Sequence, residues 1–282
     1  MGEVWTVLKL LRWTADYFKG RDIDSPRLDA ELLLADTLKL DRVGLYLNFE
    51  RPLQAGELAA YREQVRRRAG HEPLAYILGR AEFWSLPFKV TPAVLIPRPD
   101  TELLVEAALP LLAGAARVLD VGTGSGALAI ALAHERQAVT VTAIDLSAAA
   151  LAVANENART NGVAERIAFV ETDLAALPVG PFELIVANPP YIPQGDLAGL
   201  MPEVRDFEPR LALDGGPDGL DAYRALGRQA GAVLAPGGWL LVEVGIGQAA
   251  AVQELFASAG LAEIFTARDL AGIERVVGGK HA

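Results

Sequence analysis

Apolar residues in the first 70 positions recur at the spacing of an α-helix, and this part of the chain shows little of the alternation expected of a strand. Val4, Val7, Leu8 and Leu11 fall at helical spacing and predict a first helix that ends at Gly20. Ser25 and Pro26 predict the cap and first turn of a second helix. Its expected buried face carries Leu28, Leu32, Leu33 and Ala35. A short segment at 43–47 and a third helix at about 53–69 complete a small all-α domain.

Three consecutive arginines, Arg66, Arg67 and Arg68, close the third predicted helix. Cations are favoured near a helix C-terminus, where the unpaired carbonyl groups carry partial negative charge. We therefore expect the three side chains to lie in solvent, and a contact with an acidic partner is the alternative.

Prolines and aromatic residues replace the helical periodicity between residues 71 and 97. Alternating apolar residues at 88–94 predict a β-hairpin, and we interpret the whole segment as the joint between two domains. Another helix follows, and Asp100 or Thr101 is expected to cap its N-terminus.

Strand and helix patterns alternate along the rest of the chain from Arg117. The expected strands lie at 117–121, 139–144, 167–170, 182–187 and 239–244, and two further strands within 261–278 form a closing antiparallel pair. This alternation predicts an α/β fold with a mostly parallel, seven-stranded sheet covered by helices. The predicted domains are a helical domain at 1–72, a linker with the hairpin at 73–97 and the α/β domain at 98–282.

The chain is acidic, because Lys and Arg total 26 and Asp and Glu total 36, for a net charge of −10. Avid binding to naked nucleic acid normally needs a basic surface, so the composition argues against direct sequence-specific nucleic-acid binding. Cysteine is absent and the three histidines are far apart, so we expect no metal site. Every apolar run is shorter than the roughly 18 residues of a membrane span. We therefore expect no membrane contact and, because cysteine is absent, a location in the cytoplasm. We also expect a monomer.

A glycine-rich segment follows the first strand of the predicted sheet and consists of Asp120-Val121-Gly122-Thr123-Gly124-Ser125-Gly126. Glycines at this point allow a tight turn and let the backbone approach a ligand closely. The spacing Gly122-x-Gly124-x-x-Ala127 also fits a relaxed dinucleotide fingerprint, so a dehydrogenase is an alternative. Asp120 argues against a dehydrogenase, because a carboxylate at this point repels the pyrophosphate of a dinucleotide. The same carboxylate suits a cationic donor that bears an ammonium and a sulfonium group.

Two further carboxylates follow the next two predicted strands. Asp145 stands at the distance from the glycine loop that is expected of a residue accepting from both ribose hydroxyls. It would otherwise cap the next helix, although Ser147 already supplies a cap there. Asp173, which Leu174 follows, is placed to read an adenine amino group and is otherwise an ordinary turn residue.

The fourth predicted strand ends at Asn188-Pro189-Pro190-Tyr191. Each proline restricts the residue before it to extended geometry and carries no N–H, so the stretch is stiff and offers mainly acceptors. The amide oxygen of Asn188, a backbone carbonyl and the ring of Tyr191 suit a planar NH2 group, such as a carboxamide or an exocyclic base amine. Two prolines are often no more than a loop breaker, but ligands bind at the carboxyl ends of strands in sheets of this kind.

Together these residues resemble the class I (Rossmann-like) S-adenosylmethionine-dependent methyltransferases of the Asn-Pro-Pro-Tyr type. The chain further resembles the HemK/PrmC family, the peptide chain release factor glutamine N5-methyltransferases. The segments that carry this likeness are Phe83-Trp84-Ser85-Leu86-Pro87, Leu95-Ile96-Pro97-Arg98-Pro99-Asp100-Thr101-Glu102, Phe207-Glu208-Pro209 with Gly215-Gly216, and Glu274-Arg275-Val276. The likeness extends from about Pro26 to Val277 and is most specific at 83–102.

The resemblance implies that S-adenosylmethionine donates a methyl group, leaving S-adenosylhomocysteine, to the side-chain N5 of the glutamine in the Gly-Gly-Gln loop of class I release factors. The residues implied to bind the methyl donor are Asp120, Gly122, Thr123, Gly124, Ser125, Gly126, Asp145, Asp173, Leu174 and Asn188. Asn188, Pro189 and Tyr191 would be catalytic and, with Pro190, would hold the glutamine amide. Some relatives carry an aromatic residue where this chain has Leu174, so an aliphatic surface would replace a ring beside the adenine. The helical domain and the segment at 83–102 would recognise the release factor away from the glutamine.

Two other substrates share the same chemistry. A glutamine on a ribosomal protein is a sister specificity, and adenine-N6 methyltransferases acting on DNA use the same Asn-Pro-Pro-Tyr acceptors. The DNA alternative needs a target-recognition domain and a basic cleft, and the sequence shows neither.

Overall fold

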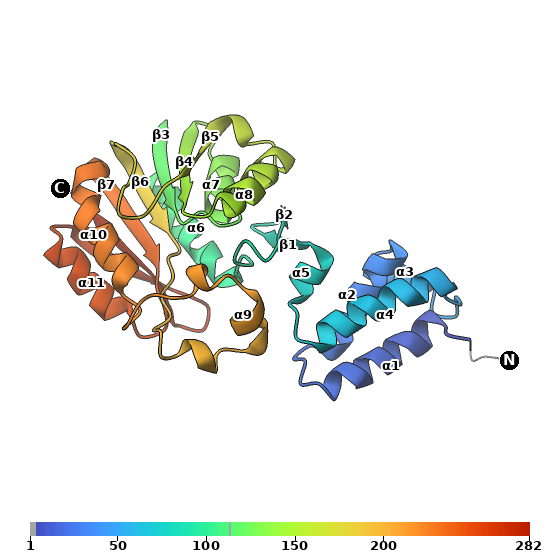
Figure 1. The fold of residues 1–282 in the computed structure, drawn as a ribbon. Coiled ribbons are helices and arrows are strands. Elements are labelled where there is room, and N and C mark those ends of the chain that lie inside the picture. The colour runs from blue at the N-terminus through green and yellow to red at the C-terminus, as the bar shows by residue number, and fades with distance from the viewer. Residues whose placement is uncertain (1–3, 113) are drawn as a thin grey trace. The chain divides into compact units, whose positions relative to one another are not determined.

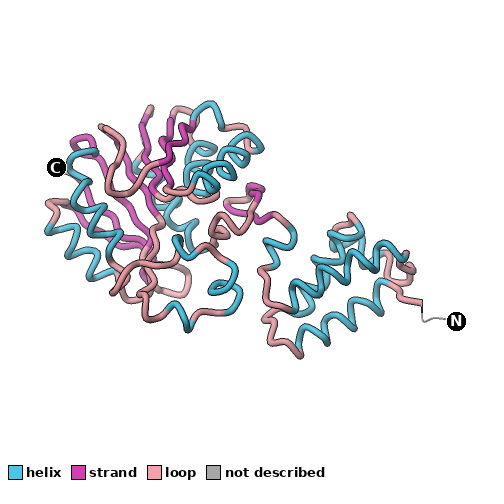
Figure 2. The backbone as a smooth tube through the Cα atoms, in the orientation of Figure 1, coloured by secondary structure: helices cyan, strands magenta, loops and turns pink. Residues whose placement is uncertain are grey.

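The computed structural model describes residues 4–112 and 114–282. Contacts within the chain define two compact units, one formed by the residues up to Gly79 together with Pro202–Phe207, and the other by Arg80–Met201 and Glu208–Ala282. In the described residues, the named strands all belong to the second unit (Figure 2). No helix in the described part of the chain is long and apolar enough to cross a membrane.

The first unit is built from six helices of the described chain: α1 (Val7–Lys19), α2 (Pro26–Leu38), α3 (Arg42–Leu47), α4 (Ala55–Ala69), α5 (Leu74–Leu78) and α9 (Pro202–Phe207). Gly20 ends α1 as predicted. The predicted buried face of α2 is partly wrong, because Leu28 is 40% exposed. The residues of α2 that enter the core are instead Ala30, Leu33, Leu34 and Ala35.

The three arginines at the end of α4 differ from one another, although all were expected in solvent. Arg66 is exposed and pairs with Glu63, and Arg67 pairs with Glu72. The side chain of Arg68 is only 5% exposed. Its Nε donates to Asp29 Oδ2 at 2.6 Å and its Nη2 to Glu203 Oε1 at 2.7 Å. The expectation was therefore wrong for Arg68, because two carboxylates distant in sequence compensate the cost of burying its charge.

The second unit begins with a two-stranded hairpin and continues into a seven-stranded sheet. The hairpin pairs β1 (Arg80–Phe83) with β2 (Leu86–Lys89). The sheet strands are β3 (Ala116–Val121), β4 (Val139–Asp145), β5 (Ile167–Glu171), β6 (Phe182–Ala187), β7 (Leu234–Glu243), β8 (Ala262–Arg268) and β9 (Glu274–Lys280). Their order is β5-β4-β3-β6-β7-β9-β8. The first five strands of this order are parallel, whereas β9 runs antiparallel to both β7 and β8, which confirms the predicted mostly parallel α/β sheet.

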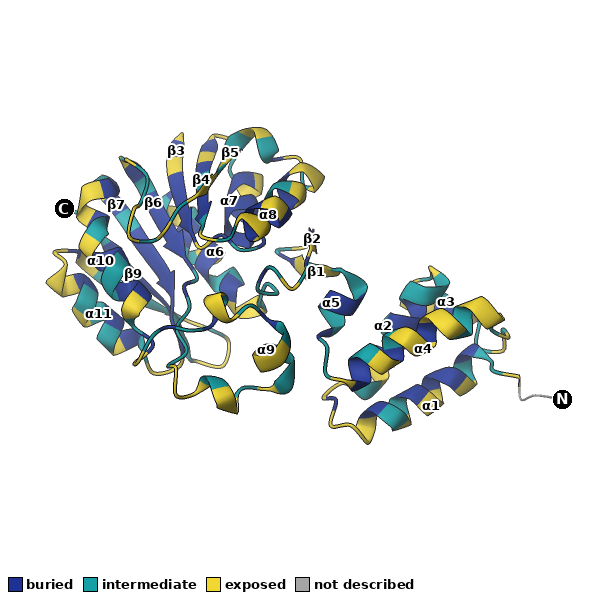
Figure 3. Cartoon of the chain, in the orientation of Figure 1, coloured by how far each residue is buried: buried dark blue, intermediate teal, exposed yellow. Residues whose placement is uncertain are grey.

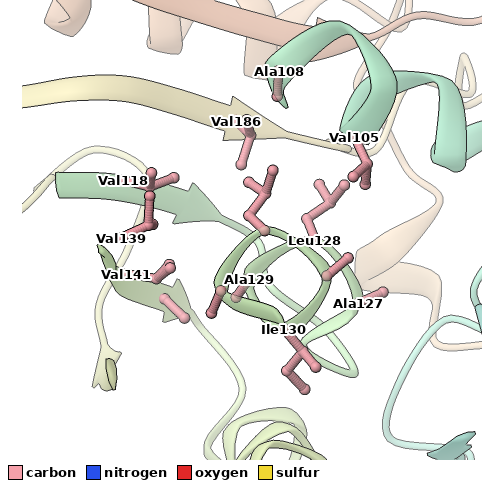
Figure 4. Packing of buried hydrophobic residues seen from close by; sticks show 14 of the residues in the cluster. Val105, Ala108, Val118, Ala127, Leu128, Ala129, Ile130, Val139, Val141 and Val186 are labelled. Carbon is pink, nitrogen blue, oxygen red and sulfur yellow. The ribbon is translucent and has the colours of Figure 1, made fainter. Parts of the chain in front are cut away.

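Helices cover both faces of this sheet (Figure 1). One face packs against α6 (Glu102–Ala108), α7 (Ala127–Glu135) and α8 (Ala148–Thr160), and the other against α10 (Asp221–Val233) and α11 (Ala249–Ser258). Side chains on a strand alternate between the faces, so Val118 and Val186 contact the first layer while Leu119 and Ala187 contact the second. Figure 4 shows Val118, Val139, Val141 and Val186 on the strands of the sheet that α7 packs against. The central strands β3 and β6 are mostly buried, with Arg117 exposed and Glu183 partly buried near their N-terminal ends (Figure 3).

The strand order reverses at the centre of the sheet, where β3 lies between β4 and β6. From β3 the chain moves outward through β4 to β5, and then returns to place β6 on the opposite side of β3. Val121 at the end of β3 is in register with Ala187 at the end of β6. The loops after these two strands must therefore diverge over opposite faces, which opens a crevice at their carboxyl ends.

Candidate active site

A cavity of about 660 Å³ lies at the carboxyl ends of β3, β4, β5 and β6 in the second unit. Its volume falls within the range of about 300–1,000 Å³ that is usual for small-molecule sites. The walls come from the loops that follow the four strands, from the segment 93–101 that leads into α6, and from 209–212. The cavity therefore lies at the point where the strand order reverses.

Most of the residues predicted from sequence to form the site line this cavity. They are Gly122, Thr123, Gly124, Ser125, Asp145, Asp173, Leu174, Asn188, Pro189 and Pro190. Three predicted residues, Asp120, Gly126 and Tyr191, are not among the lining residues.

The three glycines of the loop after β3 have positive φ, but they serve different purposes. A Cβ added at Gly122 would meet no protein atom within 4 Å, and one added at Gly124 would meet only the Gly122 carbonyl oxygen at 3.9 Å. A Cβ at Gly126 would lie 2.9 Å from Ile130 Cδ1 and 3.2 Å from Ala154 Cβ. Gly122 and Gly124 thus leave the cavity wall open to a ligand, whereas Gly126 allows the loop to pack against α7 and α8.

Asp120 lies behind the glycine loop and is 1% exposed. Its Oδ2 accepts from Thr123 Oγ1 at 2.7 Å and from the backbone N–H of Ala129, in the first turn of α7, at 3.2 Å. Among the described residues, its Oδ1 has no hydrogen-bond partner. Burial raises the pKa of Asp120 to about 7, and the two hydrogen bonds oppose that rise. In this structure Asp120 fixes the glycine loop and the start of α7, and contact with a donor stays a prediction.

Asp145 lies on the cavity wall at the end of β4. Its Oδ2 accepts from the Gly124 N–H at 2.9 Å and its Oδ1 from the Ser147 N–H at 2.9 Å. Ser147 itself caps α8 by accepting from Ala150 N. Each carboxylate oxygen retains a second lone pair, so Asp145 can tie the loops together and still accept from a ligand.

Asp173 also lines the cavity, and its Oδ1 accepts from the Ala175 N–H within its own turn. The next residue, Leu174, lines the cavity too, and its carbonyl accepts from Gln229 Nε2 of α10. Asp173 therefore stabilises its own turn and lines the cavity at the same time.

Asn188 is connected to two residues that the sequence interpretation did not assign to the site. Asn188 Nδ2 donates to Thr101 Oγ1 at 3.0 Å, and Thr101 Oγ1 donates to Glu243 Oε2 at 2.6 Å. Thr101 and Glu243 are both buried. Asp100 or Thr101 was expected to cap α6, but Asp100 pairs with Arg275, and the Thr101 side chain makes no capping hydrogen bond there and turns to Glu243 instead. Nothing in the local sequence indicates this pairing, since the two residues are 142 positions apart.

Tyr191 lies outside the cavity wall and packs against the core on the α10 and α11 face. Its carbonyl accepts from Gln248 Nε2 at 2.9 Å. Burial raises the pKa of its hydroxyl, and the neighbouring Glu243 carboxylate acts in the same direction. The phenol is therefore held neutral beside the cavity at ordinary pH, and its contact with a substrate amide stays a prediction.

Solved structures with related folds include a methyltransferase from Pyrococcus furiosus, with a TM-score of 0.52 and 17% identity over 69% of this chain and 88% of that one. Another is the Thermus thermophilus 16S rRNA N2 G1207 methyltransferase in complex with AdoMet and guanosine, with a TM-score of 0.53 and 21% identity over 72% of this chain and 50% of that one. At these identities the likeness concerns the fold alone, which is a methyltransferase fold over about 70% of the chain.

Comparison by sequence identifies the family. The family model described as the PrmC N-terminal domain matches residues 9–79, and the one described as the methyltransferase small domain matches residues 99–200. The release factor glutamine methyltransferase of Geobacter sulfurreducens is 52% identical over 99% of this chain and 98% of its own. The proteins of the same description from Bradyrhizobium diazoefficiens and Chlorobaculum tepidum are 45% and 44% identical over more than nine-tenths of both chains. The chain thus belongs to the family of release factor glutamine methyltransferases.

Proposed function

We propose that this protein transfers the methyl group of S-adenosylmethionine to the side-chain amide nitrogen, N5, of the glutamine in the Gly-Gly-Gln loop of class I peptide chain release factors. The observation that carries the proposal is the position of Asn188. It lies on the cavity wall beside the glycine loop, and its Nδ2 is already engaged by Thr101 Oγ1. Its Oδ1 is therefore the end of the amide that can accept an N–H from a substrate.

The cavity residues fit the proposed methyl donor. Gly122 and Gly124 leave space at the wall that a side chain would fill, and Asp145 has lone pairs for two ribose hydroxyls. Bound S-adenosylmethionine supplies an electrophilic methyl group on a sulfonium sulfur and leaves as S-adenosylhomocysteine. We propose that Thr123, Ser125, Asp173 and Leu174 complete the donor site, because they line the same walls.

The chain's own groups would act on the glutamine mainly by position. An amide nitrogen is a poor nucleophile, because its lone pair is delocalised into the carbonyl. Asn188 Oδ1 and the Pro189 carbonyl would each accept one N–H and hold the nitrogen in a single orientation, which can be worth several kcal/mol. As the nitrogen becomes positive, these fixed acceptor dipoles stabilise the developing charge. The proton is lost afterwards, so this mechanism requires no histidine or cysteine at the site.

Transfer of labelled methyl from S-adenosylmethionine to a purified release factor tests the proposal. We expect one methyl group per release factor, located at the glutamine by mass spectrometry. A release factor with Gly-Gly-Ala in place of Gly-Gly-Gln is the control and should remain unlabelled. Equal labelling of the two substrates would disprove the glutamine assignment.

The role of Asn188 is tested separately by the variant Asn188→Ala. We expect kcat to fall by about 100-fold or more, because two fixed acceptors are reduced to one and the nitrogen loses its orientation. The affinity for S-adenosylmethionine should change much less and can be measured by calorimetry. Turnover close to that of the wild type would contradict the mechanism.

We further propose that the helical unit recognises the release factor outside the Gly-Gly-Gln loop, and that the reaction takes place in the cytoplasm, where translation factors act. If the helical unit contributes binding, an intact release factor should have a much lower KM than a short peptide that contains Gly-Gly-Gln. Equal kcat/KM for the two substrates would show that the loop alone is recognised.

A further inference from the structure

Three side chains form a hydrogen-bonded series that ends at the proposed acceptor. Glu243 Oε2 lies 2.6 Å from Thr101 Oγ1, and Thr101 Oγ1 lies 3.0 Å from Asn188 Nδ2. Glu243 and Thr101 are buried, with exposed fractions of 2% and 4%. Thr101 and Asn188 line the cavity, and Glu243 does not. The series therefore runs from the buried interior of the second unit to the cavity.

A threonine hydroxyl has one proton to donate and two lone pairs with which to accept. An ionised carboxylate can only accept, so the hydroxyl proton of Thr101 must point to Glu243. Thr101 Oγ1 can then only accept on the side of Asn188. An asparagine amide donates at one end and accepts at the other, so the donor end of Asn188 must face Thr101.

We propose that Thr101 and Glu243 are positioning residues that fix the orientation of the Asn188 amide and so keep its Oδ1 directed to the substrate. This inference rests on the proposed function of Asn188 as an acceptor for the glutamine N–H. Without the series, the amide could turn over by 180° and present two N–H groups to the substrate's own N–H groups. The acceptor site would then become a repulsive one.

The groups around Glu243 determine its pKa, and so the pH range in which it is ionised and can accept from Thr101. Burial raises the pKa of Glu243 to about 7, and Asp100 raises it further, whereas Thr101, Arg275 and Arg98 lower it. Arg275 is shared with Asp100 and Asp269, and Arg98 pairs with Glu208 at 2.5 Å. The hydroxyls of Tyr191 and Tyr223 also interact electrostatically with this carboxyl, and both have raised pKa values.

Protonation of Glu243 would weaken the control over Asn188. A protonated carboxyl can donate to Thr101 Oγ1, which frees the threonine proton to turn toward Asn188. The correct amide orientation is therefore enforced when Glu243 is ionised, above its folded-state pKa. At saturating methyl donor and release factor, we expect kcat to rise as the pH increases through about 7.

Kinetics of three variants test the proposal. Thr101→Val removes the hydroxyl at nearly constant volume and should lower kcat by up to about 100-fold, through loss of orientation. Thr101→Ser keeps a hydroxyl and should recover most of that loss. Glu243→Gln should have a low kcat that no longer rises near pH 7. In all three, the affinity for S-adenosylmethionine should change less than about threefold, which also establishes that the variants are folded. The matched control is Thr160→Val, which removes an exposed hydroxyl bonded only to the carbonyl of Glu156 in its own helix.

A second measurement reports the orientation without any turnover. The chain contains five asparagines, so a protein labelled with ¹⁵N-asparagine gives few side-chain amide signals. The signals of Asn188 can be assigned by their loss in Asn188→Ala. We expect them to shift in Thr101→Val, to stay close to their original positions in Thr101→Ser, and to titrate with Glu243 in the wild type only.

The outcomes separate this inference from the proposed function. If the wild type labels the Gly-Gly-Gln release factor but Thr101→Val retains full kcat and unchanged Asn188 signals, the positioning role is disproved and the function stands. If the wild type fails to label the release factor, the proposed function is disproved. In that case, a shift of the Asn188 signals in Thr101→Val and their recovery in Thr101→Ser would still support the orientation by Thr101.

Discussion

Arg68 and Asp29 form a salt bridge between two almost fully buried side chains, with 2.6 Å between Arg68 Nε and Asp29 Oδ2. Glu203 of α9 accepts from the same guanidinium at 2.7 Å, and the Glu72 carbonyl accepts from Nη1 at 3.1 Å. Burial raises the pKa of Asp29 even though the Arg68 guanidinium lowers it. The site therefore disfavours a carboxylate that has lost its cation.

The first prediction concerns the stability of the helical unit. Arg68→Ala leaves Asp29 and Glu203 close together without a cation, so it should lower the free energy of unfolding by about 3–5 kcal/mol. Arg66→Ala is the matched control from the same helix end and should cost far less, because its pair with Glu63 is exposed and screened by solvent. Urea denaturation followed by circular dichroism measures both values. Equal losses for the two variants would contradict the distinction.

The same contrast shows what the sequence could and could not predict. The limits of β6 were predicted to the residue, since a mostly apolar run, interrupted only by Glu183, ends just before two prolines that cannot extend a ladder. The run of arginines offered no sign that Arg68 alone is buried, because its partners lie 39 and 135 positions away. Helix α9, which carries one of those partners, is six residues long and was not predicted.

The cavity also contains features that the sequence predicted and features that it did not. Residues that follow a strand were predicted to converge, and the order of a parallel sheet does bring Gly122, Asp145 and Asn188 to one cavity. Local capping rules pointed to the wrong partner for Thr101, because a buried carboxylate on β7 offers its hydroxyl a stronger hydrogen bond than the helix terminus does. Such a contact depends on tertiary structure and leaves no periodic pattern.

The second prediction separates two glycines of the loop after β3. Gly124→Ala adds a methyl group toward open space, so it should weaken donor binding more than it weakens folding. Gly126→Ala places a methyl group 2.9 Å from Ile130 Cδ1, so it should destabilise the fold more than Gly124→Ala does. Both variants share the cost of a positive φ, about 1–2 kcal/mol, which makes each a control for the other. Thermal unfolding and calorimetric titration with S-adenosylmethionine would measure the two effects, and the reverse ranking would refute the assignment.

The third prediction concerns Asp145. Asp145→Ala removes a carboxylate proposed to accept from two ribose hydroxyls, and hydrogen bonds to charged groups are worth about 1.5–3 kcal/mol each. The affinity for S-adenosylmethionine should therefore fall by about 10-fold or more. Glu171→Ala is the matched control, because Glu171 is an exposed carboxylate directly opposite Asp145 on β5 and does not line the cavity. Unchanged affinity in Asp145→Ala would exclude the ribose role.

The last prediction follows from the buried Asp120. Its pKa is raised from an ordinary value of 3.8 to about 7 in the folded chain. Between these two values the unfolded chain carries an ionised Asp120 while the folded chain keeps it protonated. The stabilising contribution of the protonated group is complete below the lower value and is lost as the pH rises toward the upper one.

Asp120→Asn replaces this group with a neutral one of the same size, which has no such dependence. The difference in unfolding free energy between the variant and the wild type should therefore move in favour of the variant as the pH rises from about 5 to about 7.5, by at most about 1.4 kcal/mol per pH unit. Denaturant titrations at both pH values measure this difference without donor present. Thr160→Val is the control, because it removes an exposed hydroxyl and no ionisable group, and its difference from the wild type should stay constant over this range. A constant difference for Asp120→Asn as well would mean that Asp120 is already ionised in the folded chain over this pH range. The pKa of the carboxyl behind the glycine loop would then not be raised.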